Sequence, residues 1–125
     1  MAAARKKAEY QLKQRLNKCR NAPDILRVAA GGVITAEVAA HTLHILAGQG
    51  ISGPPSRGRS DWDAVLAGVV PAATKMSVRQ FTKAVLAAAK LGLDASGPVV
   101  HALLEHAGMM YFIKHVCSPT SCHLR

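Results

Sequence analysis

The feature of this chain that most restricts its fold is an apolar helical pattern that recurs along the sequence. Three segments each open such a stripe, and they begin at Ile25, Trp62 and Val100. The two intervals between these starts are nearly equal, and each has the length of two helices with their turns, which is the unit of an α-solenoid. A repeat of this kind predicts that function lies in an extended surface and not in a catalytic pocket.

The composition favours an all-α fold. Half of the residues are hydrophobic but only 4% are aromatic, and alanine runs such as 87–89 supply strong helix formers that let helices approach one another closely. A chain of 125 residues is long enough for one domain with a modest core. We expect a short α-solenoid of antiparallel helix pairs with a basic N-terminal helix.

Capping residues and helix breakers indicate where the helices begin and end. Thr35 and Ser77 are good N-caps, and Gly92 is a good helix stop. Pro71 and Gly108 are expected to end the helices that precede them. The stretch 51–60 is rich in Gly, Pro and Ser and is expected to be a loop. The apolar helical positions in the second half are Trp62, Val65, Leu66, Val69 and Val70, then Phe81, Val85, Leu86 and Ala89, then Val100, Leu103, Leu104 and Ala107.

These signals divide the chain into three parts. Residues 1–20 form a basic N-terminal helix or leader, and residues 21–108 form a helical-repeat domain. Its units span about 21–60 and 61–97, with a partial unit at 98–108. Residues 109–125 are expected to be a capping helix and a disordered tail, because they leave the repeat pattern.

Charge is concentrated at the N-terminus. The chain has 16 Lys and Arg against 7 Asp and Glu, a formal net charge of +9. Seven of the basic residues lie within the segment 1–20, where Glu9 is the sole acid. Such a balance points to RNA, DNA or an anionic membrane as partner, with a solvated basic leader as the simpler alternative. No apolar run approaches the roughly 20 residues that span a bilayer, so no membrane insertion is expected.

Motifs for catalysis and for metal binding are missing. Cys19, Cys117 and Cys122 are an odd number and suggest a reducing compartment. The last two, with His115 and His123, are suitable ligand types, but their spacing is not a standard zinc pattern, and we predict no metal site. The sequence also lacks dinucleotide-binding and phosphate-binding glycine motifs. We therefore expect no enzyme activity, no cofactor and no small-molecule substrate.

The second unit resembles the octotricopeptide repeat. The second helix of that repeat typically has a serine at its start and then Ala-Leu-x-Ala-x-Ala-x-Leu-Gly, and the segment from Ser77 to Gly92 is similar to it. The segment from Asn21 to Asp24, with the helix from Ile34 to Gly48, is similar to a region found upstream of such repeats. Those regions occur in organellar proteins with FAST-kinase-like and RAP domains. The resemblance covers residues 17–108.

The resemblance implies binding of single-stranded organellar RNA on a curved helical surface, in RNA processing, stability or translation. It implies location in a mitochondrion or plastid, and the basic segment 1–20 partly matches a transit peptide, with the cytoplasm as the alternative. The chain holds about two and a half units, whereas useful affinity and specificity need a longer track, so we expect a fragment of a longer array or a truncated product. It has no recognisable RAP-type segment, so nuclease activity is not carried over.

Candidate RNA-binding residues follow from aligning the second helices of the two units so that Thr35 falls on Ser77. This alignment matches Glu37 with Arg79 and His41 with Lys83, so each helix carries a polar pair at the same place. Arg79 and Lys83 would bind phosphates or stack on bases, whereas Glu37 and His41 would read base edges. Further phosphate contacts are expected from Lys90, Arg57, Arg59, Lys13 and Arg15. The simpler interpretation is that these residues are the solvated faces of amphipathic helices.

A competing hypothesis assigns the chain to another class of function. It would be a non-catalytic helical module that binds a protein partner, for example in a ribosomal assembly. The contacting residues would be Trp62, Phe81, Tyr111 and Phe112.

Overall fold

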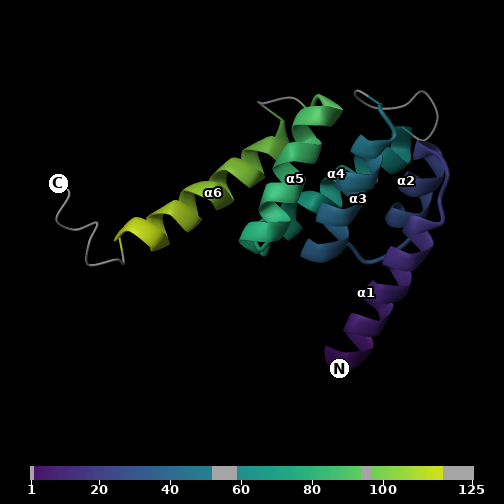
Figure 1. Ribbon diagram of the computed structural model, residues 1–125, viewed down its shortest axis with the longest axis horizontal. Coiled ribbons are helices and arrows are strands. Elements are labelled where there is room, and N and C mark those ends of the chain that lie inside the picture. The colour runs from purple at the N-terminus through teal and green to yellow at the C-terminus, as the bar shows by residue number, and fades with distance from the viewer. Residues whose placement is uncertain (1, 52–58, 94–96, 117–125) are drawn as a thin grey trace.

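The fold is known from a computed structural model that describes residues 2–51, 59–93 and 97–116, with side chains for 6–51, 59–93 and 97–108. All regular structure in these ranges is helical (Figure 1). The helices are α1 (Ala2–Asn17), α2 (Ala22–Ala30), α3 (Ala36–Gly48), α4 (Arg59–Ala73), α5 (Val78–Leu91) and α6 (Pro98–Val116). The predicted all-α class is confirmed. No helix in the described part of the chain is both long and apolar enough to cross a membrane.

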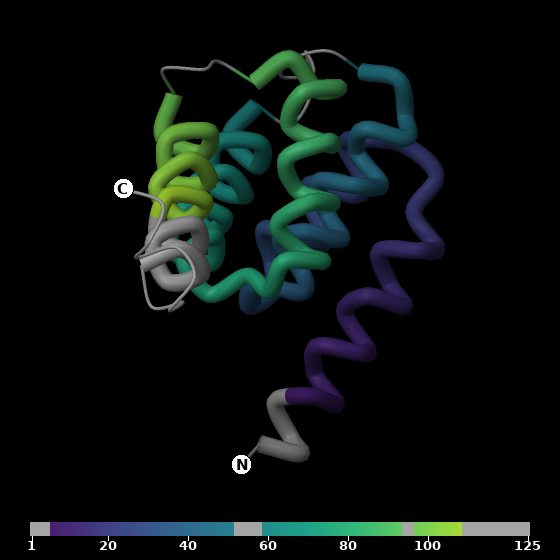
Figure 2. Tube along the Cα trace, turned by 60° about the vertical axis from the view of Figure 1, so that its left-hand side comes forward, coloured from purple at the N-terminus to yellow at the C-terminus, as the bar shows by residue number. Residues whose placement is uncertain are grey.

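Helices that are two apart in the chain are neighbours in space. α1 packs on α3 and α3 on α5, while α2 packs on α4 and α4 on α6 (Figures 1 and 2). α3 also contacts both α2 and α4, so it lies at the centre of the packing. Among the described helix pairs, α3 and α5 share the most extensive contact. The surface formed by α1, α3 and α5 is the one that carries the candidate site.

Polar contacts hold α1 against α3. Three side-chain pairs join the two helices in order along both: Glu9 with Thr35, Lys13 with Glu37, and Asn17 with His41. Because the residue numbers rise together, α1 and α3 run in the same direction. Figure 1 shows that the N-terminal half of α1 extends away from the rest of the molecule.

Apolar contacts anchor the C-terminal half of α1. Leu12 and Leu16 are 7% and 1% exposed and belong to the hydrophobic core. Leu12 packs directly over Gly32, where an added Cβ would lie 2.7 Å from Leu12 Cδ2. The glycine therefore allows the close approach of the basic helix to the turn between α2 and α3.

The predicted helix caps are confirmed at α3 and α5. Thr35 caps α3 by accepting a hydrogen bond from the backbone N–H of Val38 at 3.3 Å. Ser77 and Gln80 form a reciprocal capping box at the start of α5, with N···O distances of 3.2 and 2.9 Å. Gly92 ends α5 in the left-handed conformation with φ of 69°, which a residue without Cβ adopts at little cost.

Three predicted helix boundaries are wrong. α4 continues through Pro71 to Ala73, and α6 continues through Gly108 to Val116. Pro71 removes one backbone hydrogen bond near the end of α4, but the extension buries Ala73 completely. A glycine within a helix costs only about 1 kcal/mol relative to alanine. The expected loop at 51–60 also differs, because Arg59 and Ser60 belong to α4.

Burial on α5 and α6 differs from the apolar pattern of the sequence. α5 buries its small residues Ala84, Ala87 and Ala88 together with Leu91, while Val85 and Leu86 are 37% and 59% exposed. The cause is the close packing of α3, which favours small side chains at the contact. On α6 the buried residues are Val99, Ala102 and Leu103, and Leu104 is 61% exposed. On α4 the expected face is confirmed at Trp62, Val65 and Val69.

Candidate nucleic-acid-binding groove

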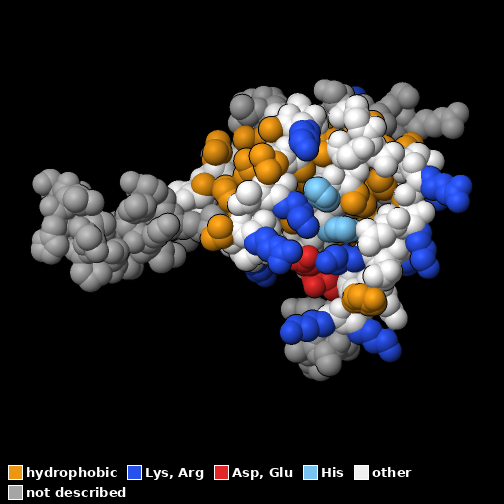
Figure 3. Space-filling view, viewed as in Figure 1, with side chains coloured by type: hydrophobic (Ala, Val, Ile, Leu, Met, Phe, Trp, Pro, Cys, Tyr) orange, Lys and Arg blue, Asp and Glu red, His pale blue; other side chains and the backbone are white. Residues whose placement is uncertain are grey.

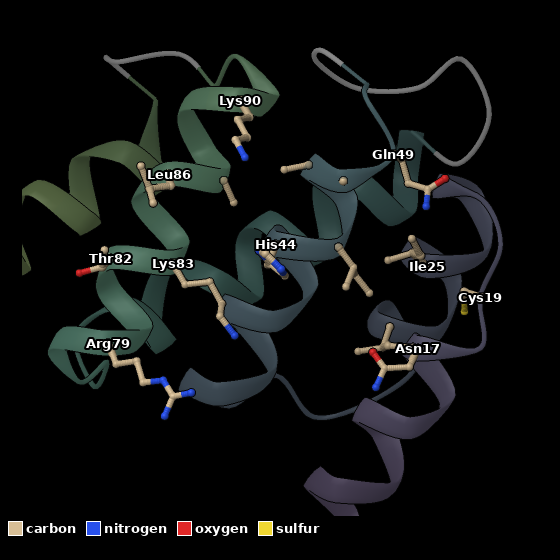
Figure 4. Close-up of a pocket in the computed structure, with 15 residues that line it drawn as sticks. Asn17, Cys19, Ile25, His44, Gln49, Arg79, Thr82, Lys83, Leu86 and Lys90 are labelled. Atoms are coloured by element: carbon tan, nitrogen blue, oxygen red, sulfur yellow. The ribbon is translucent and has the colours of Figure 1, made fainter.

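An open groove of about 740 Å³ lies between α3 and α5 and reaches the C-terminal end of α1 (Figure 4). We call it the central groove. Its lining residues are Leu16, Asn17, Cys19, Ile25, His44, Ile45, Ala47, Gly48, Gln49, Arg79, Thr82, Lys83, Leu86, Ala87 and Lys90. None of these described residues is acidic, so the lining carries only positive formal charge.

The α5 wall of the groove supplies the cations. Arg79, Lys83 and Lys90 all project from this helix, and the Lys83 side chain extends from α5 toward α3 (Figure 4). At 1.5 Å of rise per residue, Arg79 and Lys90 are separated by about 16 Å along the helix axis. On the same face of the molecule, lysine and arginine side chains surround a central patch of histidine (Figure 3). This wall can hold several negative charges arranged in a row.

The opposite wall of the groove is formed by α1 and α3. Its amide groups carry no charge, and the residues beneath them are apolar. Asn17, His44 and Gln49 contribute its polar groups, above the side chains of Leu16 and Ile45. A hydrogen bond between Asn17 Oδ1 and His41 Nε2, at 2.7 Å, holds the Asn17 side chain in place. The groove thus combines a cationic wall with a wall of amide and imidazole groups.

A polar cluster joins α1, α3 and α5 at the N-terminal end of the groove. Glu37 Oε1 accepts a hydrogen bond from Lys13 Nζ at 2.8 Å, and Glu37 Oε2 accepts one from Gln80 Nε2 at 2.7 Å. The hydrogen bonds from Lys13 and Gln80 lower the pKa of Glu37, and the positive charges of Lys13 and Lys83 add to this effect. Glu37 therefore stays ionised and links the three helices.

The imidazole of His41 lies among positive charges. Burial lowers the pKa of His41 below its ordinary value, and the charges of Lys13, Lys83 and His44 lower it further, against an opposing effect of Glu37. At neutral pH the ring is therefore uncharged. A neutral ring with Nε2 protonated donates to Asn17 Oδ1, so His41 orients a groove residue without lining the groove itself.

The residues predicted from sequence occupy different positions in this arrangement. Arg79, Lys83 and Lys90 line the central groove. Lys13 and Glu37 are paired with each other, although both, together with Arg79 and Lys83, also border a smaller adjacent depression of about 490 Å³. The remaining predicted cations are elsewhere: Arg15 is exposed on α1, Arg59 is exposed at the start of α4, and Arg57 lies outside the described residues.

Sequence reasoning missed four polar groove residues, which are Asn17, His44, Gln49 and Thr82. The sequence carries a helix-periodic pattern that could have identified two of them, Asn17 and His44. Asn17 follows Lys13 by four residues and His44 follows His41 by three, so each shares a helix face with a residue already singled out. The contribution of Gln49 and Thr82 depends on the packing of α3 against α5, which the local pattern does not show.

Two of the four aromatic residues assigned to a protein interface, Trp62 and Phe81, pack inside the fold. Trp62 is 4% exposed and belongs to the core. Phe81 is half-buried and makes an edge-to-face contact with His106, with ring centroids 6.0 Å apart. The side chains of Tyr111 and Phe112 lie outside the described residues, as do those of the considered metal ligands His115, Cys117, Cys122 and His123.

Cys19 is the one cysteine whose surroundings are described. Burial raises the pKa of its thiol, with a further contribution from Asp24. The thiol also donates a weak hydrogen bond to the carbonyl of Arg15 at 3.4 Å. Both effects favour an unreactive thiol at neutral pH.

Comparison with known proteins yields no assignment: no family model, no curated protein and no solved structure matches this chain.

Proposed function

We propose that this chain is a non-catalytic protein that binds single-stranded RNA in the central groove. The observation that carries the proposal is the row of Arg79, Lys83 and Lys90 along one wall of an open groove whose lining holds no acid. Cations in a row attract a phosphate backbone and release its counterions, which supplies affinity without regard to sequence. The amide and imidazole groups opposite them are of the kind that contact base edges.

A single strand suits this groove better than a duplex. Its lining includes apolar side chains that a ligand can reach, such as the half-buried Ile45 and the exposed Leu86, and such surface accommodates the faces of unpaired bases. In a duplex those faces are stacked inside the helix and cannot reach the protein. Two or three phosphate contacts on single-stranded RNA correspond to a salt slope between about −1.4 and about −2.1 in log affinity against log salt concentration.

The architecture we propose for this function is a short α-solenoid. In it, α2 with α3 and α4 with α5 form two antiparallel pairs, and α6 begins a third. Two observations support it. Helices two apart in the chain are packing neighbours. His106, near the middle of α6, contacts the carbonyl of Met76 just before α5 begins, at 2.7 Å, as expected when α5 and α6 run in opposite directions.

The experiment is a fluorescence anisotropy titration of the whole chain with short labelled RNA strands, between about 50 and 200 mM salt. Affinity is expected to fall as salt rises. The double variant Arg79→Glu with Lys83→Glu is expected to lose at least about tenfold in affinity, because it replaces two attractive charges with two repulsive ones. An unlabelled RNA duplex should compete poorly with the single strand.

Lys75→Glu is the matched control for Lys83→Glu, since each variant reverses one lysine. Lys75 is exposed in the turn between α4 and α5 and borders a different depression, with Lys6 and Glu9. Lys83→Glu is expected to weaken binding several-fold more than Lys75→Glu. Equal effects of the two variants, or wild-type affinity in the double variant, would reject the groove as the RNA site.

An organellar role in RNA metabolism, in a mitochondrion or plastid, is part of the same proposal. Its support is the resemblance to the octotricopeptide repeat and the basic segment 1–20. Expression of the chain with a C-terminal fluorescent tag tests it directly. Diffuse cytoplasmic fluorescence would contradict this part without affecting the RNA-binding test.

A second candidate function is docking to a second copy of the chain through the end formed by α5 and α6. Val85 and Leu104 are 37% and 61% exposed there, and together with Leu103 they border an apolar hollow of about 180 Å³. In the alignment of the two second helices, Val85 matches Leu43, which is fully buried on the α3 helix that receives α5. The helix packing that joins α3 to α5 would thus continue from α5 into the second copy of the chain. Sedimentation should show a concentration-dependent dimer that Val85→Glu with Leu104→Glu abolishes, and a monomer at all concentrations would reject it.

A further inference from the structure

We propose that the projecting part of α1 is a second RNA-binding surface, on which a base stacks on Tyr10 while Lys6 and Lys7 bind the neighbouring phosphates. We call this surface, from Lys6 to Tyr10, the α1 arm. None of its residues lines the central groove. The inference rests on the proposed RNA binding and extends the contact with RNA beyond the groove.

The first observation is the exposure of the Tyr10 ring. Tyr10 is 63% exposed, whereas Trp62 is 4% exposed and Phe81 is half-buried. Among the residues whose side chains the structure describes, Tyr10 is therefore the one aromatic residue that lies open to a ligand. Proteins that bind single strands use exposed aromatic rings as platforms on which bases stack. Such a platform needs a free ring face and no pocket.

The second observation is the side of α1 on which this ring lies. Leu12 and Leu16 face the core, while Asn17 lines the central groove. Tyr10 precedes Asn17 by seven residues, almost two full turns, so the two residues lie on the same side of the helix. Their separation along the helix axis is about 10 Å. The ring therefore lies in line with the α1 residue that borders the groove.

A continuous path joins the central groove to the α1 arm. Arg79 and Lys83 line the groove, and together with Lys13 they also border the adjacent depression of about 490 Å³. Lys13 follows Tyr10 by three residues, so the two side chains are neighbours on the surface of α1. A strand that leaves the groove over this depression therefore meets cations before it reaches the Tyr10 ring.

The third observation is the positive charge around the ring. Lys6 and Lys7 precede Tyr10 by four and three residues, and both are exposed. Lysine and arginine side chains lie along the projecting end of the molecule (Figure 3). Glu9 is the sole acid of α1, and its carboxylate accepts a hydrogen bond from the hydroxyl of Thr35 on the side that faces α3. An exposed ring beside lysines suits a single strand, in which bases and phosphates are both accessible.

The test titrates a labelled single-stranded RNA with the wild-type chain and with three variants of Tyr10. Tyr10→Ala is expected to weaken binding about fivefold or more, the usual effect of removing one stacking ring. Tyr10→Phe keeps the ring and should bind like the wild type. Tyr10→Leu keeps apolar bulk without a flat ring and should weaken binding nearly as much as Tyr10→Ala. Thermal melts of the four proteins should agree, because the side chain is largely exposed.

A salt series separates stacking from charge. Tyr10→Ala removes no charge and should leave the slope of log affinity against log salt concentration unchanged. The double variant Lys6→Ala with Lys7→Ala should make the slope shallower by about 1.4, because two phosphate contacts are lost.

The variant Tyr10→Trp reports stacking directly. The chain has a single tryptophan, Trp62, and this residue is buried. Stacking of a base on the added indole should quench its fluorescence as RNA is titrated. The emission of the wild type comes from Trp62 and should change little.

The outcomes distinguish this inference from the function on which it rests. If the wild type binds no single strand with a salt dependence, RNA binding itself is rejected. If Arg79→Glu with Lys83→Glu weakens binding but Tyr10→Ala binds as tightly as Tyr10→Phe, the groove stands and the α1 arm is rejected. Unquenched fluorescence of Tyr10→Trp at saturating RNA would also overturn stacking. An unchanged salt slope in the lysine double variant would overturn the phosphate contacts of the arm.

Discussion

The Lys13 Nζ atom lies 2.8 Å from Glu37 Oε1, and this ion pair joins the basic first helix to the helix at the centre of the fold. The other oxygen of the same carboxylate accepts a hydrogen bond from Gln80 on α5 at 2.7 Å. One side chain therefore connects the three helices that form the candidate binding surface. The contacts are partly exposed, since the Lys13 and Glu37 side chains retain 30% and 32% of their accessible surface.

The Lys13–Glu37 pair should contribute modestly to stability. Glu37→Ala is expected to lower the free energy of unfolding by about 1 kcal/mol, because it removes two hydrogen bonds that are partly screened by water. A double-mutant cycle with Lys13→Ala should give a coupling energy of about 0.5 kcal/mol or more in urea denaturation. The control is Glu105→Ala, whose partner His101 is 69% exposed, and its effect should be close to zero. A coupling energy of zero for Lys13 and Glu37 would contradict the prediction.

His41 should make the folded state less stable as the pH falls. Burial and the charges of Lys13, Lys83 and His44 lower its pKa in the folded protein. As the pH decreases below about 6.5, the unfolded chain therefore takes up a proton that the folded chain still excludes. The contribution of His41 is fully present above that pH and is lost as the pH falls through its folded pKa. Urea midpoints measured on both sides of about pH 6.5 should show this decrease.

His41→Gln removes the titration and keeps a donor for Asn17. Its stability should depend less steeply on pH than that of the wild type over the same window. His101→Gln, at an exposed position on α6, should leave the pH dependence unchanged. Identical pH profiles for wild type and His41→Gln would show that this ring does not control the acid sensitivity of the fold.

The first helix should be an integral part of the core at its C-terminal half. Leu16 is 1% exposed, so Leu16→Ala is expected to cost about 2 to 4 kcal/mol through lost burial and the cavity that remains. Tyr10→Ala on the same helix is the control, because Tyr10 is 63% exposed, and its cost should stay below about 0.5 kcal/mol. Similar melting temperatures for the two variants would show that α1 does not stabilise the fold.

Thr42 carries a buried hydroxyl without a partner among the described atoms. It is fully buried on α3. Replacing it with valine, which has nearly the same shape, should raise the free energy of unfolding by about 1 kcal/mol by removing a desolvated polar group. Thr82→Val on exposed α5 surface is the control, where the hydroxyl donates to the carbonyl of Val78 at 2.8 Å. A destabilised Thr42→Val protein would indicate that the hydroxyl is satisfied in solution.

Local signals predict the helix caps well. Thr35, Ser77 and Gly92 act within their own turn of chain, so their effect does not depend on tertiary packing. Pro71 and Gly108 are expected to end helices and do not. A glycine inside a helix costs only about 1 kcal/mol relative to alanine. Pro71 lies near the end of α4, where the hydrogen bond that it removes is offset by burial beyond it, as at Ala73.

The candidate site could be predicted only in part. The row of Arg79 and Lys83 is a helix-periodic pattern, and the sequence shows it directly. The pairing of Glu37 with Lys13 joins residues 24 positions apart and depends on how α1 lies on α3. The same is true of Asn17, whose place in the groove follows from its contact with His41. Contacts between helices decide which polar residues remain free for a ligand.

The direction that α1 and α3 share is also that of α5, and this has an electrical consequence. α5 runs the same way as α3, since Gln80 and Glu37 meet near the starts of both helices and Lys90 and Gln49 share the groove near their ends. The peptide dipoles of α3 and α5 therefore add instead of cancelling. The groove is more positive beside Arg79 than beside Lys90, although each carries a single charge. A polyanion lying in it would experience a gradient from one end to the other, which gives this small surface a polarity.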